Sequence, residues 1–161
     1  MKIKTRAEIE KISAELKKKG KKIVTTNGCF DLMHAGHVDS LEKAKALGDV
    51  LIIGLNSDDS VRKVKGPLRP IVDEKNRARM LAALEVVDYV VIFNESEPSS
   101  LLGAIKPDIH VKGADRKMSE IIEKDAVEKN GGKVVLMPFE LNISTTQIIN
   151  RIIKINENEK S

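Results

Sequence analysis

The sequence predicts an α/β protein with a doubly wound, parallel, five-stranded sheet and helices on both faces. Short runs rich in Val, Ile and Leu alternate with segments whose apolar residues recur at helical spacing. The runs are separated by helices rather than by tight turns, and parallel strands need such long crossover connections. The runs are almost continuously apolar, as expected for strands covered on both faces.

The length of 161 residues suits one domain with a substantial core. The chain contains no internal repeat and no low-complexity linker. We therefore predict a single domain over residues 1–161, with an N-terminal helix inside residues 1–20 and a frayed tail over residues 156–161.

The first half of the chain opens with a capping box, Thr5 to Glu8, which predicts a helix that Gly20 ends. An apolar run then predicts the first strand, and a helical pattern follows it. A polar, basic stretch after the second strand predicts a loop. The elements expected after the first helix are a strand at 22–26, a helix at 36–47, a strand at 50–55 and a helix at 73–84.

The second half continues the alternation. Pro98 is typical of a helix start, the Asn130-Gly131-Gly132 sequence ends a helix, and Ser144 to Gln147 forms a second capping box. The elements expected here are a strand at 89–93, a helix at 98–105, a strand at 109–112, a helix at 119–129, a strand at 134–137 and a helix at 145–155.

The composition is that of a globular protein and argues against a nucleic-acid partner. Hydrophobic residues make up 41% and charged residues 32%, as in globular proteins. One Tyr and three Phe supply few stacking platforms for single-stranded nucleic acid, and the net charge of +4 is spread along the chain. We predict no nucleic-acid partner.

Localisation is predicted from cysteine usage and from the apolar runs. Cys29 is the only cysteine, so no intrachain disulfide forms and a reducing compartment is expected. No run approaches the roughly 20 apolar residues that span a bilayer, and the N-terminus lacks a signal-peptide pattern. We expect a cytoplasmic protein with no membrane partner.

The stretch TTNGCFDLMHAGH, residues 25–37, leaves the first strand and enters the first long helix. In Rossmann-like sheets, ligands bind beyond the carboxyl ends of the strands. Gly28 permits a tight turn, and the helix start offers free N–H groups to a phosphate. His34 and His37, three residues apart, project to one side of that start. The spacing predicts a phosphate clamp.

Three alternatives exist for this stretch. Cys29, Asp31, His34 and His37 are possible metal ligands, but no H-E-x-x-H motif and no distant Cys or His pair completes a site, so we predict no metal. Cys29 with a histidine base is a possible nucleophile, although a small buried thiol is commoner after an apolar strand. Both histidines are also possible structural residues.

Five blocks in order resemble the small H-x-G-H nucleotidyltransferases, the cytidylyltransferase-like superfamily, and are most similar to heptose 1-phosphate adenylyltransferases. The resemblance covers residues 21–153. It rests on TNGCFDLMHAGH, on Lys65-Gly66, on DEKNR at 73–77, on DIHVKGAD at 108–115 and on Ser144-Thr145-Thr146.

The resemblance implies an enzyme that joins a phosphorylated substrate to the α-phosphate of a nucleoside triphosphate and releases pyrophosphate. For this branch it implies ATP, carried with Mg²⁺, and a sugar 1-phosphate, D-glycero-D-manno-heptose 1-phosphate. The product would be ADP-heptose for lipopolysaccharide synthesis. A homodimer is implied as well.

Site residues follow from the same resemblance. His34, His37 and Lys65 are expected to act on the phosphates, and Arg77 to reach a substrate phosphate, unless Arg77 forms a helix-face ion pair with Asp73 or Glu74. His110 is expected to be a packed side chain. Nucleotide contacts are implied for Gly28, Cys29, Phe30, Asp31, Gly36, Lys112, Gly113, Asp115, Ser144, Thr145 and Thr146.

The residue types suit this chemistry. A phosphate monoester has a second pKa of about 6, so the attacking group is already ionised at neutral pH and needs no base. The enzyme must instead hold two anions in line and neutralise the charge that develops between them. Histidines and lysines supply those donors.

The sequence differs from its closest relatives in two places. Arg116 stands where an aromatic residue is frequent, and would favour a carbonyl-bearing base such as cytosine or guanine, and Asn142-Ile143 replaces a Gly-Cys pair. Phe139-Glu140 stands where glycerol 3-phosphate cytidylyltransferases carry an Arg-Thr pair, which favours the heptose branch. The open alternatives are a glycerol 3-phosphate cytidylyltransferase, an FMN adenylyltransferase and a non-catalytic nucleotide-sensing module.

Overall fold

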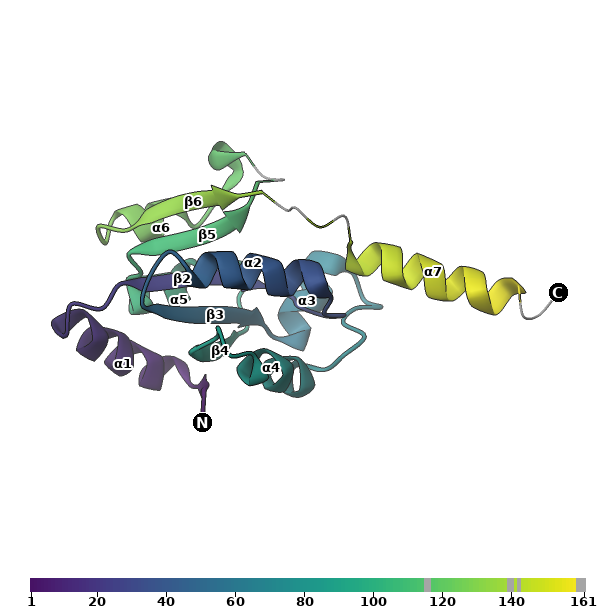
Figure 1. The fold of residues 1–161 in the computed structure, drawn as a ribbon, viewed down its shortest axis with the longest axis horizontal. Coiled ribbons are helices and arrows are strands. Elements are labelled where there is room, and N and C mark those ends of the chain that lie inside the picture. Colours follow the sequence, from purple (N-terminus) through teal and green to yellow (C-terminus); the bar gives the residue numbers. More distant parts are fainter. Residues whose placement is uncertain (115–116, 139–140, 142, 159–161) are drawn as a thin grey trace.

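A parallel sheet of six strands forms the centre of the protein, in the order β1-β4-β3-β2-β5-β6 (Figure 1). The computed structural model describes residues 1–114, 117–138, 141 and 143–158. The strands are β1 (Ile3–Lys4), β2 (Ile23–Gly28), β3 (Val50–Asn56), β4 (Tyr89–Phe93), β5 (Ile109–Gly113) and β6 (Lys133–Met137). The predicted fold class is confirmed. The sixth strand, β1, was not predicted, because two residues are too few to form an alternating pattern.

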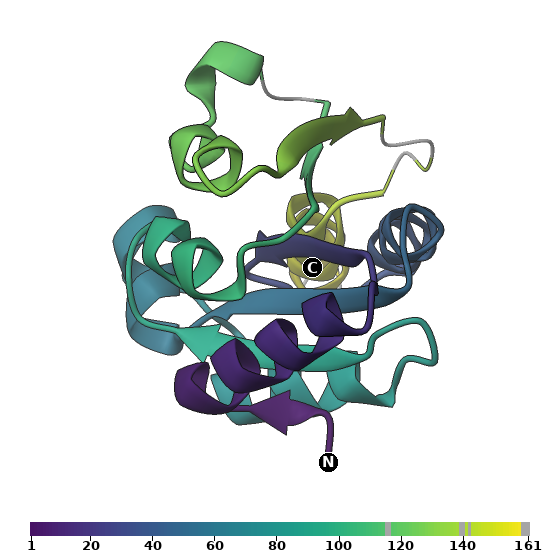
Figure 2. The same ribbon diagram turned by 90° about the vertical axis from the view of Figure 1, so that its left-hand side faces the viewer.

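Helices cover both faces of the sheet, as Figure 2 shows from the side. One face carries α1 (Arg6–Lys18), α5 (Ser99–Ile105) and α6 (Lys124–Glu128), with Ile9, Leu101 and Ile105 packed on the strands. The other face carries α2 (Ala35–Lys45) and α4 (Glu74–Ala83). Two helices lie beyond the sheet: α3 (Asp58–Lys65) and α7 (Thr145–Asn158).

The strand order places β2 at the switch point of the sheet. From β2 the chain proceeds outward through β3 and β4, then returns to the other side of β2 for β5 and β6. The crevice at such a reversal, beyond the carboxyl ends of the strands, is where ligands bind in open α/β sheets. The H-x-G-H stretch follows β2 directly, so the fold puts it at this crevice.

Helix α3 replaces the loop that the sequence predicted, and the prediction was wrong there. Ser57 caps the helix by accepting a hydrogen bond from the Ser60 N–H, at 3.1 Å. Acidic residues lie in the first turn and basic residues in the last, which complements the helix dipole. The cap, the order of the charges and the buried Val61 together favour a helix in this polar stretch.

Two other boundaries differ from prediction. Instead of one helix at 119–129, a 3-10 helix (Met118–Glu120) precedes the short α6, and the turn between them buries Ile121 and Glu123. Helix α7 continues through Asn158, so the tail predicted to fray at 156 is helical at 156–158, and residues 159–161 lie outside the described residues.

Helix α7 extends away from the sheet (Figure 1), and none of its described residues is buried. Ile152, Ile153 and Ile155 are each about half exposed. In the part of the chain that the structure describes, no helix combines the length and the apolar character needed to cross a bilayer.

Candidate functional site

The turn after β2 brings the backbone into close contact with an aromatic ring. A Cβ atom on Gly28 would lie 3.1 Å from the ring of Phe30, which itself adopts a positive φ of 46°. A larger residue at position 28 would press on that ring, so Gly28 suits the close packing of this turn.

His34 and His37 lie stacked at the start of α2, as the spacing predicted. Their ring centroids are 3.9 Å apart, and the main-chain N–H of His34 donates to Nδ1 of His37 at 3.4 Å. A Cβ on Gly36 would lie 3.1 Å from His34 Nδ1 and 3.3 Å from the Ile143 side chain. The glycine of H-x-G-H is thus needed for the close approach of both neighbours.

Both imidazoles are neutral at physiological pH. Burial lowers the pKa of His37 to about 4, with a further contribution from His34, and burial also lowers the pKa of His34. Because His37 Nδ1 accepts a hydrogen bond, its ring proton is on Nε2, which leaves that N–H as a donor. Nδ1 of His34 is buried without a hydrogen-bond partner among the described residues.

Asp31 does not face the crevice, contrary to the prediction that it contacts a nucleotide. Its side chain is 1% exposed and accepts hydrogen bonds from the N–H groups of Ile71 (2.8 Å) and Val72 (2.9 Å). Arg69 pairs with it at 2.6 Å. Burial raises the pKa of Asp31, but these donors lower it by more. Asp31 holds the 69–72 segment in place.

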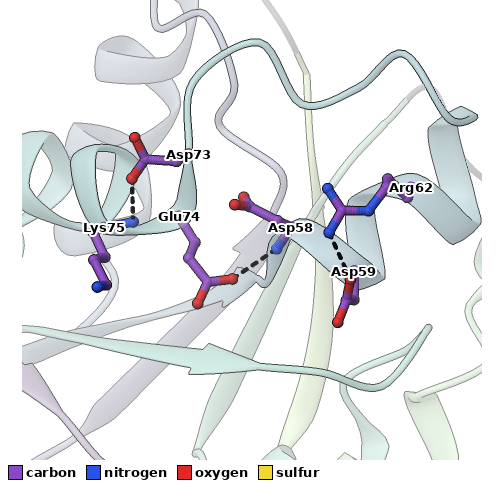
Figure 3. A pocket seen from close by; sticks show the side chains of 6 residues that line it. All are labelled: Asp58, Asp59, Arg62, Asp73, Glu74 and Lys75. Carbon is purple, nitrogen blue, oxygen red and sulfur yellow. Dashed lines mark hydrogen bonds and ion pairs between the residues drawn. The ribbon is translucent and has the colours of Figure 1, made fainter.

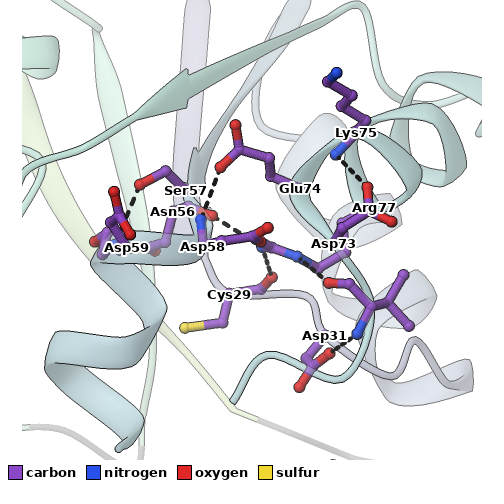
Figure 4. Close-up of polar contacts among 12 residues, drawn as sticks. Cys29, Asp31, Asn56, Ser57, Asp58, Asp59, Asp73, Glu74, Lys75 and Arg77 are labelled. Carbon is purple, nitrogen blue, oxygen red and sulfur yellow. Dashed lines mark hydrogen bonds and ion pairs between the residues drawn. The ribbon is translucent and has the colours of Figure 1, made fainter. Parts of the chain in front are cut away.

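Arg77 is fully buried and joins segments that are distant in the sequence (Figure 4). Such a guanidinium has five N–H donors in a fixed planar arrangement. It donates to the carbonyls of Cys29 (2.5 Å), Asn56 (2.9 Å) and Val72 (2.8 Å) and to the Asp58 carboxylate (2.7 Å).

The prediction that Arg77 reaches a substrate phosphate is therefore corrected, because its side chain has no exposed surface. The alternative ion pair with Asp73 or Glu74 does not form either. Asp73 caps α4, and Glu74 accepts the N–H of Asp58 at 2.8 Å. No local pattern could identify Asp58, 19 residues away, as the partner.

Lys65 is the last residue of α3 and is exposed. No hydrogen bond or ion pair joins it to any residue that the structure describes. Burial raises the pKa of the Cys29 thiol, and the positive charge of Lys65 partly offsets that effect. A protonated thiol is a poor nucleophile. Burial therefore disfavours Cys29 as a nucleophile at this edge.

The end of β5 carries Lys112 and Gly113. The Lys112 ammonium donates to Asn27 Oδ1 at 2.6 Å and pairs with the Glu123 carboxylate. The N–H of Ala114 donates to the Met137 carbonyl at 2.9 Å, so it is not available to read a base. Asp115 and Arg116 lie outside the described residues.

The start of α7 reaches the H-x-G-H turn. Ser144 and Gln147 form the predicted capping box, with bonds of 2.7 and 3.2 Å. The Thr145 hydroxyl donates to the Leu32 carbonyl at 3.1 Å, which brings this helix start to the turn before His34. Thr146 is exposed beside it. Phe139, Glu140 and Asn142 lie outside the described residues.

A hollow of about 390 Å³ lies between α3 and α4 (Figure 3) and contains none of the predicted site residues. Four carboxylates make it unfavourable for phosphates. Its lining residues are Asp58, Asp59, Arg62, Asp73, Glu74 and Lys75. Within the described ranges, no three His, Cys, Asp or Glu side chains are grouped so as to hold a metal ion.

Comparison with known proteins points to one family. A family model described as cytidylyltransferase-like matches residues 25–151. The chain is 54% identical over 143 residues to bifunctional protein HldE of Geobacter metallireducens, covering 89% of this chain and 29% of that protein. It is 50% identical over 153 residues to bifunctional protein HldE of Trichlorobacter lovleyi, covering 95% of this chain and 31% of that protein. The chain thus spans about a third of the length of these relatives.

Two solved structures are similar. The lipopolysaccharide core biosynthesis protein of Thermoplasma volcanium has a TM-score of 0.63 at 31% identity, over 77% of this chain and 100% of that one. The pantoate-beta-alanine ligase of Francisella tularensis has a TM-score of 0.61 at 18% identity, over 98% of this chain and 79% of that one. The second likeness concerns the fold alone.

Proposed function

Because the chain belongs to the cytidylyltransferase-like family and is a nucleotidyltransferase, we propose that it transfers the AMP moiety of ATP to a sugar 1-phosphate. The proposed acceptor is D-glycero-D-manno-heptose 1-phosphate, and the products are ADP-heptose and pyrophosphate. Relatives at about half identity that are named bifunctional protein HldE support this choice. The observation that carries it is the stacked His34–His37 pair at the switch point of the sheet.

The reaction forms a bond from an acceptor phosphate oxygen to the α-phosphorus and breaks the bond from that phosphorus to the bridging oxygen of the leaving pyrophosphate. The acceptor is already ionised near neutral pH, so no base is needed. His37 Nε2–H donates to the phosphate oxygens, and the start of α2 adds its backbone N–H groups. A bound phosphate anion also favours protonation of the imidazoles.

Lys65 and the start of α7 supply further positive potential. Lys65 brings a cation to the end of α3, and Ser144 and Thr146 lie at the first turn of α7 beside the histidine turn. Mg²⁺ enters with ATP as part of the substrate, held by triphosphate oxygens. Asp31 is fully engaged by the 69–72 segment, so its carboxylate serves the protein and not that ion.

Pyrophosphate release with ATP, CTP, GTP and UTP, each paired with heptose 1-phosphate, glycerol 3-phosphate and FMN, tests the function. We expect the highest kcat/KM for ATP with the heptose phosphate. A preference for CTP of about tenfold, which is about 1.4 kcal/mol in the transition state, would overturn the adenylyl assignment. Nucleotide binding without release in any pairing would indicate a sensing module.

The assembly and the location are proposed with the function. We propose a homodimer, which the exposed isoleucines of α7 support, because an uncovered apolar helix face favours association. We also propose a cytoplasmic location, in keeping with Cys29 as a free thiol.

A further inference from the structure

The Lys112 ammonium is held in a defined direction by two side chains. It donates to Asn27 Oδ1 at 2.6 Å on β2 and pairs with Glu123 from the segment before α6. An ammonium has three N–H donors. The Lys112 side chain remains 19% exposed. One donor is thus directed at Asn27 and the ammonium is paired with Glu123, while the exposed part of the side chain leaves room for a further contact at the carboxyl end of β5.

Glu123 is an unusual residue for this position, because its carboxylate is only 6% exposed. The turn between the 3-10 helix and α6 directs it inward, under β5. Burial raises the pKa of Glu123, but the neighbouring His110 ring and the charge of Lys112 lower it to about 2. The carboxylate is therefore ionised at every pH at which the protein works.

The His110 ring contacts the Glu123 carboxylate from the core side. It is fully buried on β5, with Nδ1 2.8 Å from Thr25 Oγ1 and Nε2 3.4 Å from Glu123 Oε1. Burial lowers the pKa of His110, so the ring is neutral. With the ring proton on Nε2, the Thr25 hydroxyl can donate to Nδ1, and Nε2 lies 3.4 Å from Glu123 Oε1, a contact that falls short of a hydrogen bond.

Successive polar contacts link these side chains from the core to the carboxyl end of β2, in the order Thr25, His110, Glu123, Lys112 and Asn27. Buried ion pairs seldom stabilise a fold more than apolar residues of the same volume would. This series of contacts ends at Asn27, directly before Gly28 and the histidine turn. Its position is thus better explained by the ligand that binds there than by stability.

We propose that Glu123 is a positioning residue for nucleotide binding: with Asn27 it directs the Lys112 ammonium toward the nucleotide, and His110 holds Glu123 in place. The inference rests on the proposed function, which supplies the nucleotide. The ligand atom is an anionic or carbonyl oxygen of ATP. Because Lys112 contacts the nucleotide before and during the reaction alike, loss of Glu123 weakens binding and leaves kcat nearly unchanged.

A double-mutant cycle tests this, with the Kd for MgATP measured by calorimetry on wild type, Glu123→Gln, Lys112→Ala and the double variant. We expect Glu123→Gln to weaken ATP binding about tenfold when Lys112 is present and less than about twofold when it is Ala. Glu128→Gln, which loses only a surface pair with Lys124 on α6, serves as the matched control and should bind as wild type.

Wild-type affinity in Glu123→Gln, or an equal loss with and without Lys112, would overturn the proposal, since the second result marks a general folding defect. Melting temperatures of all variants identify such a defect. If Glu123→Gln does not fold, Asn27→Ser removes the other contact of the ammonium from a different strand. It should weaken ATP binding in the same Lys112-dependent manner, and wild-type affinity there would count against the proposal.

A second measurement needs no nucleotide. Reductive methylation followed by mass spectrometry reports how readily the Lys112 amine reacts, and an amine held by Glu123 reacts slowly. Glu123→Gln should raise the rate at Lys112 several-fold and leave the rate at Lys124 unchanged. If wild type binds no triphosphate, the proposed function fails, but the methylation rate still shows whether Glu123 holds the Lys112 amine. An unchanged rate at Lys112 in Glu123→Gln overturns the positioning role.

Discussion

Two stacked, neutral imidazoles at the start of α2 set the chemistry available at the residue scale. Because burial keeps His34 and His37 uncharged in the free protein, the proposed clamp would meet a phosphate with hydrogen-bond donors and not with fixed cations. Donors fixed in advance need no reorganisation when charge develops on the phosphates, which is how they lower a barrier.

Substitution of either histidine by Ala should lower kcat by about 10²-fold, by analogy with the loss of one oxyanion-hole donor, while MgATP binding falls less. His37→Gln keeps an N–H donor on a side chain of similar reach and should retain more activity than His37→Ala. Steady-state kinetics and calorimetry separate the two effects. Near wild-type turnover in both Ala variants would exclude the clamp.

The lowered histidine pKa values also predict the pH dependence of stability. His37 takes up a proton at about pH 4 in the folded protein and at about 6.5 in the unfolded chain, so the unfolded chain binds more protons between these values. The free energy of unfolding should therefore fall as pH drops from about 6.5 to 4.

Urea titrations at a series of pH values measure this slope in wild type and in His37→Gln. The variant should show a shallower fall, with the remainder due to His34 and His110 and, toward pH 4, to carboxylates such as Glu123 and Asp31, whose pKa values are lowered as well. Identical slopes would mean that His37 is not buried in solution as it is here.

At the scale of elements, the helical geometry of α3 separates its two neighbouring lysines. Residues two apart on a helix point about 200° apart around its axis, so Lys63 and Lys65 face nearly opposite sides. Lys65 is the one whose charge is felt at Cys29.

Lys65→Ala should clearly lower kcat/KM for ATP, whereas Lys63→Ala should leave kcat/KM nearly unchanged. Both side chains are exposed in the last turn of α3, so the pair is matched for charge and for helix propensity. Equal losses in the two variants, measured by pyrophosphate release, would show that α3 contributes only its total charge.

The carboxyl ends of β2 and β3 are joined to α3 and α4 by the Arg77 guanidinium. Replacing it with Met leaves the Asp58 carboxylate and three carbonyls without this donor. We expect Arg77→Met to destabilise the protein by about 3–5 kcal/mol, as for other broken buried pairs.

Arg79→Met is the control, because Arg79 is exposed on the same helix. Chemical denaturation compares the two variants. A stable Arg77→Met protein with a specific loss of ATP binding would restore the phosphate-contact role that the buried geometry argues against.

At the scale of the whole molecule, α7 leaves the body of the protein with its isoleucines uncovered (Figure 1). A row of apolar side chains on a projecting helix is favourable only when another surface covers it. The proposed homodimer would bury this face.

Ile152→Lys and Ile153→Lys together should convert a dimer to a monomer, as measured by analytical ultracentrifugation. Ile122→Lys introduces the same charge at a site that is 74% exposed and lies apart from α7, and it should leave the dimer intact. A monomeric wild-type protein at micromolar concentration would contradict the proposed assembly.

The sequence by itself determined the features that depend on neighbouring residues. Capping boxes at Thr5 and Ser144, the apolar runs of the sheet and the three-residue spacing of His34 and His37 are all local, and the structure agrees with them. The strand–helix alternation was sufficient to predict a parallel sheet, since only a crossover connects parallel neighbours.

Tertiary structure decided where the long polar side chains go. Arg77, Asp31 and Glu123 lie close to the motif or within it, yet all three turn inward, toward partners up to 48 residues distant. A charged side chain is buried only where several segments together supply its partners, and that condition has no local pattern. This is why the sequence predicted ligand contacts for Asp31 and Arg77, whereas both side chains turn inward in the fold.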